Sequence, residues 1–161
     1  MNRVAGTGIG AVTSIGNDAM TLWENLKNGV CGIGPITRFD TADYKAKVAA
    51  EVRDFDPTLY TAKSALRKND LYTQYAVAAA VQAVEDRKIV GTLEPERVGT
   101  YIGSGIGGIG TFAEEQTVLL EKGSRKVSPF FIPKLIANMA GGVIAIRYNF
   151  QGASIPVVTA C

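Results

Sequence analysis

Cys161 is the residue of this sequence whose side chain is best suited to covalent chemistry, because a cysteine thiolate is a strong nucleophile. It follows an apolar stretch, residues 155–159, whose β-branched side chains favour a buried strand. In α/β sheets, reactive groups gather at the carboxyl end of such a strand. A reactive thiol also needs a histidine, a cation or a helix N-terminus to stabilise its thiolate, and the chain contains no histidine. Cys161 is therefore either an inert buried thiol, which composition alone favours, or the nucleophile of a catalytic body whose other groups are absent from this chain.

A glycine-rich stretch, residues 103–108, is the second candidate, since its sequence GSGIGG matches the pattern G-x-G-x-x-G of dinucleotide-binding loops. That pattern indicates a nucleotide only when an acidic residue ends a second strand about 20 residues further on. Glu121 stands near that distance, but Thr111 and Glu114 predict a capping box for a helix that runs to Lys122 and includes Glu121. A loop in which the backbone packs closely is the favoured interpretation, and nucleotide binding is the lesser alternative.

Charged and aromatic side chains supply further candidates for binding. The basic side chains form two clusters along the sequence, and each taken alone is typical of solvated helix and loop ends. Phe130 and Phe131 lie between two prolines and favour a core or interface position over a ligand pocket. The basic clusters consist of Lys63, Arg67 and Lys68 and of Arg125 and Lys126.

The composition limits the classes of function. The chain has 161 residues, which suits one domain, and its 17 Lys and Arg against 15 Asp and Glu leave a net charge of +2, too small to indicate nucleic acid. No apolar run approaches the roughly 18 residues of a membrane span, and the N-terminus lacks a signal-peptide pattern. Cys31 and Cys161 fit neither a disulfide framework nor a zinc site, and Cys31 is expected to be buried and silent. We expect a cytoplasmic protein without a metal, a nucleic acid or a membrane as partner.

The elements that must position these residues alternate between strands and helices. The clearest helix spans residues 70–87, because its alanine-rich centre is apolar on every side and should be widely buried. An amphipathic helix should begin at Asn17 or Asp18 and end at Asn28. This alternation predicts an α/β domain with a mostly parallel sheet. Strands are expected at residues 3–7, 47–52, 97–102 and 155–159, an apolar loop at residues 128–133, and further helical segments at residues 111–122, 136–140 and 143–148.

Six segments together resemble the β-ketoacyl-acyl carrier protein synthases of fatty acid synthesis, and among these the elongating type II enzymes. Each segment alone would be a weak signal, but together they are highly specific, and the resemblance spans the whole chain. They are TGIGAVTSIGND at residues 7–18, PITRFDTADY at 35–44, YTQYAVAAA at 72–80, IGSGIGGIGTF at 102–112, VSPFFIP at 127–133 and VVTAC at 157–161.

The resemblance implies a thiolase-like fold, in which two similar α/β halves stack into five alternating layers, αβαβα. Residues 1–161 would be most of the first half, truncated at the nucleophile, with the second half absent. By similarity Cys161 is the catalytic nucleophile, which takes an acyl group from acyl carrier protein and condenses it with a malonyl thioester that loses carbon dioxide. The family's two histidines and its assisting lysine would lie in the missing half, so this chain alone is expected to be inactive.

The resemblance also implies roles for binding residues. Ile106 would line the acyl pocket, and Phe131 would reach across a homodimer interface to help close the partner's pocket. The basic residues Lys63, Arg67, Lys68, Arg125 and Lys126 would form the docking surface for the acidic carrier protein. No cofactor and no metal are implied. A polyketide-type ketosynthase and a non-catalytic dimerising subunit of the same fold remain the alternatives, and Ala5-Gly6 in the first strand and Asn69 depart from the family's pattern.

Overall fold

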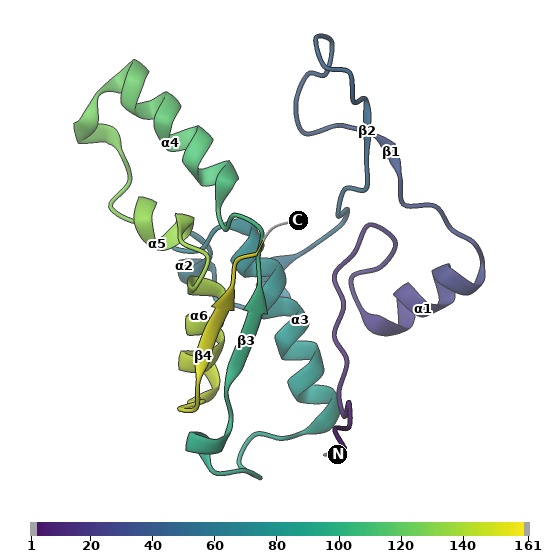
Figure 1. Ribbon diagram of the computed structural model, residues 1–161. Helices are drawn as coiled ribbons and strands as arrows, with labels where there is room; N and C mark the ends of the chain where they lie inside the picture. Colours follow the sequence, from purple (N-terminus) through teal and green to yellow (C-terminus); the bar gives the residue numbers. More distant parts are fainter. Residues whose placement is uncertain (1–2, 160–161) are drawn as a thin grey trace.

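Helices and short strands alternate along the chain in the computed structural model, which describes residues 3–159 (Figure 1). This confirms the predicted α/β class. In chain order the elements are α1 (Ala19–Lys27), β1 (Gly34–Pro35), β2 (Val48–Ala49), η1 (Pro57–Leu59), α2 (Lys63–Leu66), α3 (Leu71–Arg87), η2 (Pro95–Arg97), β3 (Thr100–Gly103), α4 (Ile109–Lys122), η3 (Ser124–Lys126), α5 (Phe131–Leu135), α6 (Met139–Tyr148) and β4 (Ser154–Val157).

The parallel pair β3–β4 is the sheet that carries the candidate site. Thr100 lies opposite Ser154 and Gly103 opposite Val157. Parallel strands require a crossover connection, and the segment containing α4, α5 and α6 supplies it. The other pair, β1–β2, is antiparallel. The strand expected at residues 47–52 is present as β2, but it contains only Val48–Ala49.

The core lies where α6 packs between this pair of strands and α3. Val77 and Val81 of α3 and Ile144 of α6 are each only 3% exposed, and Ile102 of β3 packs against them. The helix predicted at residues 70–87 is confirmed as α3, with Asp70 as its N-cap. One face of α3 is fully buried, and its buried residues are Thr73, Val77, Ala78, Val81 and Val84.

Helix α1 forms because Asp18 caps it and the chain then reaches Gly29, which has a φ of +65°. The Asp18 carboxylate accepts the backbone N–H of Thr21, and this bond lowers the pKa of Asp18. The amphipathic face is present, but Met20, Trp23 and Leu26 are 71%, 58% and 54% exposed. The N-cap at Asp18 and the turn at Gly29, and not burial against other described elements, therefore account for helix α1.

The strand expected at residues 3–7 is wrong, because no strand forms there. The backbone donors that follow this stretch bond instead to side chains of α3. Ile9 donates to the Asp86 carboxylate at 3.1 Å, and Ala11 donates to the Gln82 side chain at 3.0 Å. The N-terminal segment runs along α3, as Figure 1 also shows, and this places glycines against the helix backbone.

The expectation that the last strand is buried is also wrong for the residues described. All four residues of β4 are exposed, with Ile155 at 44% and Val157 at 43%. Within the described part of the chain, β4 pairs only with β3. With a neighbour on one edge and helix α6 against it, the strand keeps apolar surface in contact with water.

In the stretch from residue 3 to residue 159, no helix combines the length and the apolar character that crossing a bilayer requires.

Candidate functional site

The glycine loop at residues 103–108 folds over the carboxyl ends of β3 and β4. Ser104 donates its backbone N–H to the Val157 carbonyl at 3.1 Å, and its hydroxyl accepts the N–H of Gly107 at 3.0 Å. A hollow of about 200 Å³ lies beside the loop and is lined by Gly103, Ser104, Gly105, Val157 and Thr159. This hollow lies at the carboxyl edge of the sheet, where α/β folds generally place their sites. The predicted nucleophile, Cys161, lies outside the described residues.

The helix after the loop starts differently from the prediction. Helix α4 begins at Ile109 with Gly108 as its N-cap, and no side chain caps it. The capping box of Thr111 and Glu114 is therefore wrong, because Thr111 lies within the first turn and its hydroxyl donates to Asp70 instead. Glu121 does lie inside α4, as expected, so the acidic strand end that a dinucleotide loop requires is not at that position.

Gly107 and Gly108 bring this loop against the end of α5. Gly107 has a φ of +83°, which favours glycine, and the N–H of Gly108 donates to the Leu135 carbonyl at 2.9 Å. A side chain at either glycine would overlap the backbone carbonyls of residues 134–135. Helix α5 contains Phe131, so the structure brings the loop that carries Ile106 next to the helix that carries Phe131.

The two predicted pocket residues differ in their surroundings. Ile106 is 62% exposed at the tip of the glycine loop. Phe131 is half-buried, with its ring centroid 6.3 Å from that of Phe112 in α4. Helix α5 forms where the sequence predicted a loop, and residues 136–138 of the helical segment predicted at 136–140 are not helical. Ile106 therefore presents an exposed apolar side chain, and Phe131 presents a partly covered aromatic ring.

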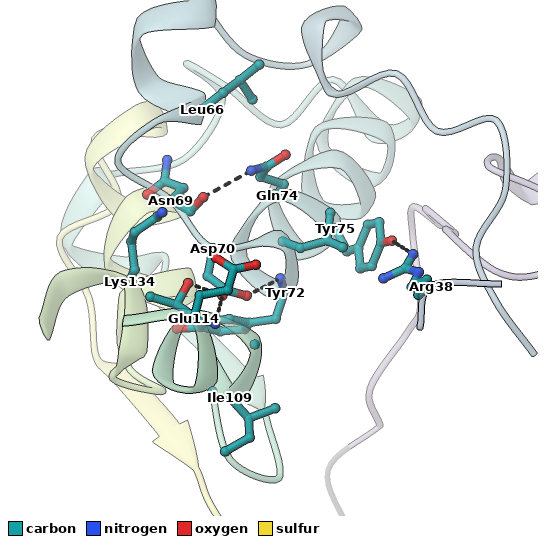
Figure 2. Close-up of a pocket in the computed structure, with 14 residues that line it drawn as sticks. Arg38, Leu66, Asn69, Asp70, Tyr72, Gln74, Tyr75, Ile109, Glu114 and Lys134 are labelled. Carbon is teal, nitrogen blue, oxygen red and sulfur yellow. Dashed lines mark hydrogen bonds between the residues drawn. The ribbon is translucent and has the colours of Figure 1, made fainter. Parts of the chain in front are cut away.

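Asp70 is the residue of this region that the sequence analysis did not single out. One carboxylate oxygen accepts the N–H of Tyr72 at 2.9 Å and caps α3. The other accepts the hydroxyl of Thr111 at 2.5 Å and its backbone N–H at 3.4 Å (Figure 2). An aspartate before an apolar helix signals the cap, but its bond to a residue 41 positions away has no local sequence signal.

A cavity of about 520 Å³ adjoins Asp70 between the starts of α3 and α4 and the side chain of Lys134, as Figure 2 shows. On its far side the Arg38 guanidinium donates to the Tyr75 hydroxyl at 3.0 Å, and this bond raises the pKa of Arg38. The lining is mixed, with charged, amide and phenol groups. The cavity can therefore accept polar groups, in contrast to the apolar surface of Ile106 and Phe131.

The structure does not merge the basic residues into one cluster. Lys63 begins α2 and Arg67 and Lys68 follow it, whereas η3 lies at the outer end of α4, away from α2 in Figure 1. All five side chains are exposed, as a docking surface requires. The ammonium of Lys68 lies 5.7 Å from the centre of the Phe130 ring, so the first cluster contacts the segment that leads into α5. Arg125 and Lys126 belong to η3.

Cys31 is exposed, so the expectation of a buried thiol is wrong. It lies in the loop after α1, just beyond the turn at Gly29, where no element covers it. Within residues 3–159, no group of three or more histidine, cysteine, aspartate or glutamate side chains is arranged to hold a metal ion.

Two further carboxyl groups have a lowered pKa, and both stabilise loops other than the glycine loop. The hydroxyl of Thr37 donates to Glu51 at 2.7 Å and lowers the pKa of Glu51. The hydroxyl of Thr58 donates to Asp56 at 2.6 Å and lowers the pKa of Asp56. Both carboxylates accept bonds from neighbouring residues, which indicates local structural roles.

Comparison with known proteins gives one consistent match. Residues 1–161 match the family model described as the β-ketoacyl synthase N-terminal domain. Among curated proteins, the 3-oxoacyl-[acyl-carrier-protein] synthase 2 of Coxiella burnetii is 45% identical over 160 residues, which are 99% of this chain and 39% of that protein. This chain therefore spans well under half the length of that relative.

Solved structures show the same thiolase-like α/β fold. The ishigamide ketosynthase/chain length factor superposes with a TM-score of 0.81 at 30% identity over 96% of this chain and 39% of that one. A type II polyketide ketosynthase, solved in complex with its acyl-carrier protein and bound to a hexaketide, superposes with a TM-score of 0.73 at 23% identity over 90% of this chain and 38% of that one.

Proposed function

The chain belongs to the β-ketoacyl synthase family, whose N-terminal domain it matches over residues 1–161, and from this we propose that the complete protein is an elongating, decarboxylating β-ketoacyl-acyl carrier protein synthase of fatty acid synthesis. The observation that carries the proposal is the 45% identity over 160 residues to a 3-oxoacyl-[acyl-carrier-protein] synthase 2. The exposed glycine loop at the carboxyl edge of β3 and β4 supports it. The protein would work in the cytoplasm as a homodimer.

Cys161 would act as the nucleophile in a reaction of two steps, acyl transfer and condensation. Its thiolate attacks the thioester of an acylated carrier protein, so that the acyl group moves to the cysteine sulfur and the carrier thiol leaves. A malonyl thioester then loses carbon dioxide, and its carbanion attacks the acyl-cysteine and expels the thiolate. The chain contains no histidine, so any histidine that assists decarboxylation must lie in residues outside this stretch.

Ile106 and Phe131 would shape the acyl pocket. Their support is the contact between the glycine loop and α5, which joins the two segments at Gly108 and Leu135. Ile106 would line the pocket of its own subunit. Phe131, on the family's pattern, would help to close the pocket of the partner subunit.

The test of this function is acyl transfer to a mapped residue. We expect the complete protein, mixed with an acylated carrier protein, to gain the mass of one acyl group, and peptide mapping should place it on Cys161. Cys31 serves as an internal control, because its thiol is exposed. Acylation of both cysteines to the same extent would indicate nonspecific transfer and would contradict the proposal.

The basic residues would dock an acidic acyl carrier protein through charge complementarity, which mainly increases the rate of encounter. All of them are exposed, and Lys68 lies over Phe130, next to a proposed pocket residue. Docking there would place the carrier close to α5. The residues concerned are Lys63, Arg67, Lys68, Arg125 and Lys126.

Charge reversal tests this docking surface. We expect the double variant Lys63→Glu and Lys68→Glu to lower kcat/KM for carrier-bound substrates by about tenfold at low salt, with a smaller difference at high salt. Each single variant, Lys63→Glu and Lys68→Glu, is compared with Lys45→Glu as the matched control, because Lys45 is also exposed but lies in the loop before β2. An equal loss with a small thioester that lacks the carrier would show damage to the site and not to docking.

A polyketide-type ketosynthase is the second candidate, because the solved structures with high TM-scores include a type II polyketide ketosynthase. Product analysis separates the two functions. A fatty acid enzyme extends a saturated acyl chain once per cycle, whereas a polyketide enzyme would accept and extend a chain that already contains several ketones.

A further inference from the structure

We infer that Asp70 is a positioning residue for the acyl pocket, acting through Thr111 on the loop that carries Ile106. The inference rests on the proposed function, and within it assigns a role to two residues at the meeting point of α3 and α4. Neither residue would touch the reacting atoms.

The Asp70 carboxylate connects the first turns of two helices. It caps α3 through the N–H of Tyr72 at 2.9 Å, and it accepts both the hydroxyl and the N–H of Thr111 in the first turn of α4. Thr111 is 4% exposed, whereas Asp70 is only partly buried and lines the cavity of about 520 Å³, so this carboxylate–hydroxyl bond is partly shielded from water. Hydrogen bonds to a charged acceptor are stronger than neutral ones, and shielding increases the difference.

Helix α4 has no side-chain cap of its own, because its N-cap is Gly108. A negative charge near a helix N-terminus is favourable, since the first N–H groups of a helix lack partners within it. Asp70 supplies this charge to α4 from another element. The position of the first turn of α4 therefore depends on Asp70 and not on the sequence of α4 alone.

The position of the first turn of α4 also affects the position of Ile106, because Ile106 comes just before this helix in the chain. The N–H of Gly108 bonds to Leu135, and a Cβ at Gly108 would stand 3.0 Å from the Asp70 carboxylate. The backbone at Gly108 is therefore tightly packed. On the other side, Ser104 is bonded to Val157 and to Gly107. Gly105 and Ile106 form a short tip between these anchors, and moving the start of α4 must move the tip.

Thr111→Val tests the inference, because valine keeps the shape of threonine and removes only the hydroxyl. In the complete protein, we expect kcat/KM for a long acyl chain relative to a short one to fall about tenfold, the factor that one bond to a carboxylate represents. The reason is that a long chain contacts the loop and a short one does not. Thr111→Ser retains the hydroxyl and should stay close to the wild type.

A purely structural role predicts a different pattern. If Thr111→Val lowers the melting temperature but leaves the ratio of long-chain to short-chain kcat/KM unchanged, the positioning role is wrong. Asp70→Asn removes the charge of the acceptor and should shift the ratio in the same direction, and adding Thr111→Val to it should cause little further change, because both variants weaken the same Asp70–Thr111 bond. Additive effects would overturn the inference. Absence of condensation by the wild-type protein would instead overturn the proposed function.

Discussion

Cys161→Ser in the complete protein should lower the rate of condensation by at least about 10³-fold, because a serine hydroxyl is almost entirely protonated at neutral pH and a poorer nucleophile than a thiolate. The expected defect is in acyl transfer itself. It should appear as loss of the acyl-enzyme in mass spectrometry and as loss of product in a carrier-protein assay.

Cys31→Ser is the matched control for this prediction. It makes the same chemical change at an exposed cysteine in a loop after α1, and we expect it to leave the rate within about twofold of the wild type. Full acyl loading of the Cys161→Ser protein would exclude the nucleophile role. In that event the alternative of a non-catalytic, dimerising subunit of the same fold would be favoured.

Gly10→Ala should destabilise the protein by about 2–3 kcal/mol or prevent folding, the upper part of the range for overpacking. A Cβ at this position would overlap the backbone carbonyl of Ala79 in α3 and would stand 2.9 Å from the Cβ of Gln82. A side chain can change its rotamer, but the carbonyl of a helix interior cannot move without breaking its own hydrogen bond. The measurement is urea unfolding of the complete protein, followed by circular dichroism.

Gly6→Ala is a control in the same segment, since a Cβ at Gly6 would meet nothing within 4 Å. We expect its unfolding midpoint to match the wild type or to rise slightly, because alanine reduces the entropy of the unfolded chain. Equal midpoints for Gly10→Ala and Gly6→Ala would mean that the N-terminal segment does not lie against α3. The packing of residues 8–11 on that helix would then be wrong.

Helix ends were the part of the fold that could be predicted with most success. Asp18 was one of two predicted N-caps and is the N-cap of α1, and the helix predicted at residues 70–87 is α3, with Asp70 as its N-cap and Leu71 as its first residue. Capping depends on atoms two or three residues apart, so the sequence contains all the information it needs. Where a helix start depends on a distant partner, as with Thr111 and Asp70, the local pattern predicted a capping box that does not form.

Strands and burial were predicted less well, because they depend on neighbours that are distant in sequence. The N-terminal stretch has a strand-like composition, yet its donors bond to Asp86 and Gln82 of α3. The apolar run before Cys161 does form a strand, but Ile155 and Val157 remain exposed within the described chain. Strand pairing and side-chain burial depend on which elements come together in the fold. The residues near a strand in the sequence do not specify those partners.

For the candidate site, the sequence alone determined which side-chain groups are available: a thiol at Cys161, an apolar side chain at Ile106 in a glycine-rich stretch, and two clusters of basic residues. Side-chain chemistry is a property of each residue and needs no fold. Only the tertiary structure decided that the glycine loop bonds to the end of β4 and to α5, and that Asp70 bonds to Thr111 in the first turn of α4. Those contacts join residues 27 to 53 positions apart, and only packing brings such distant groups within hydrogen-bonding distance.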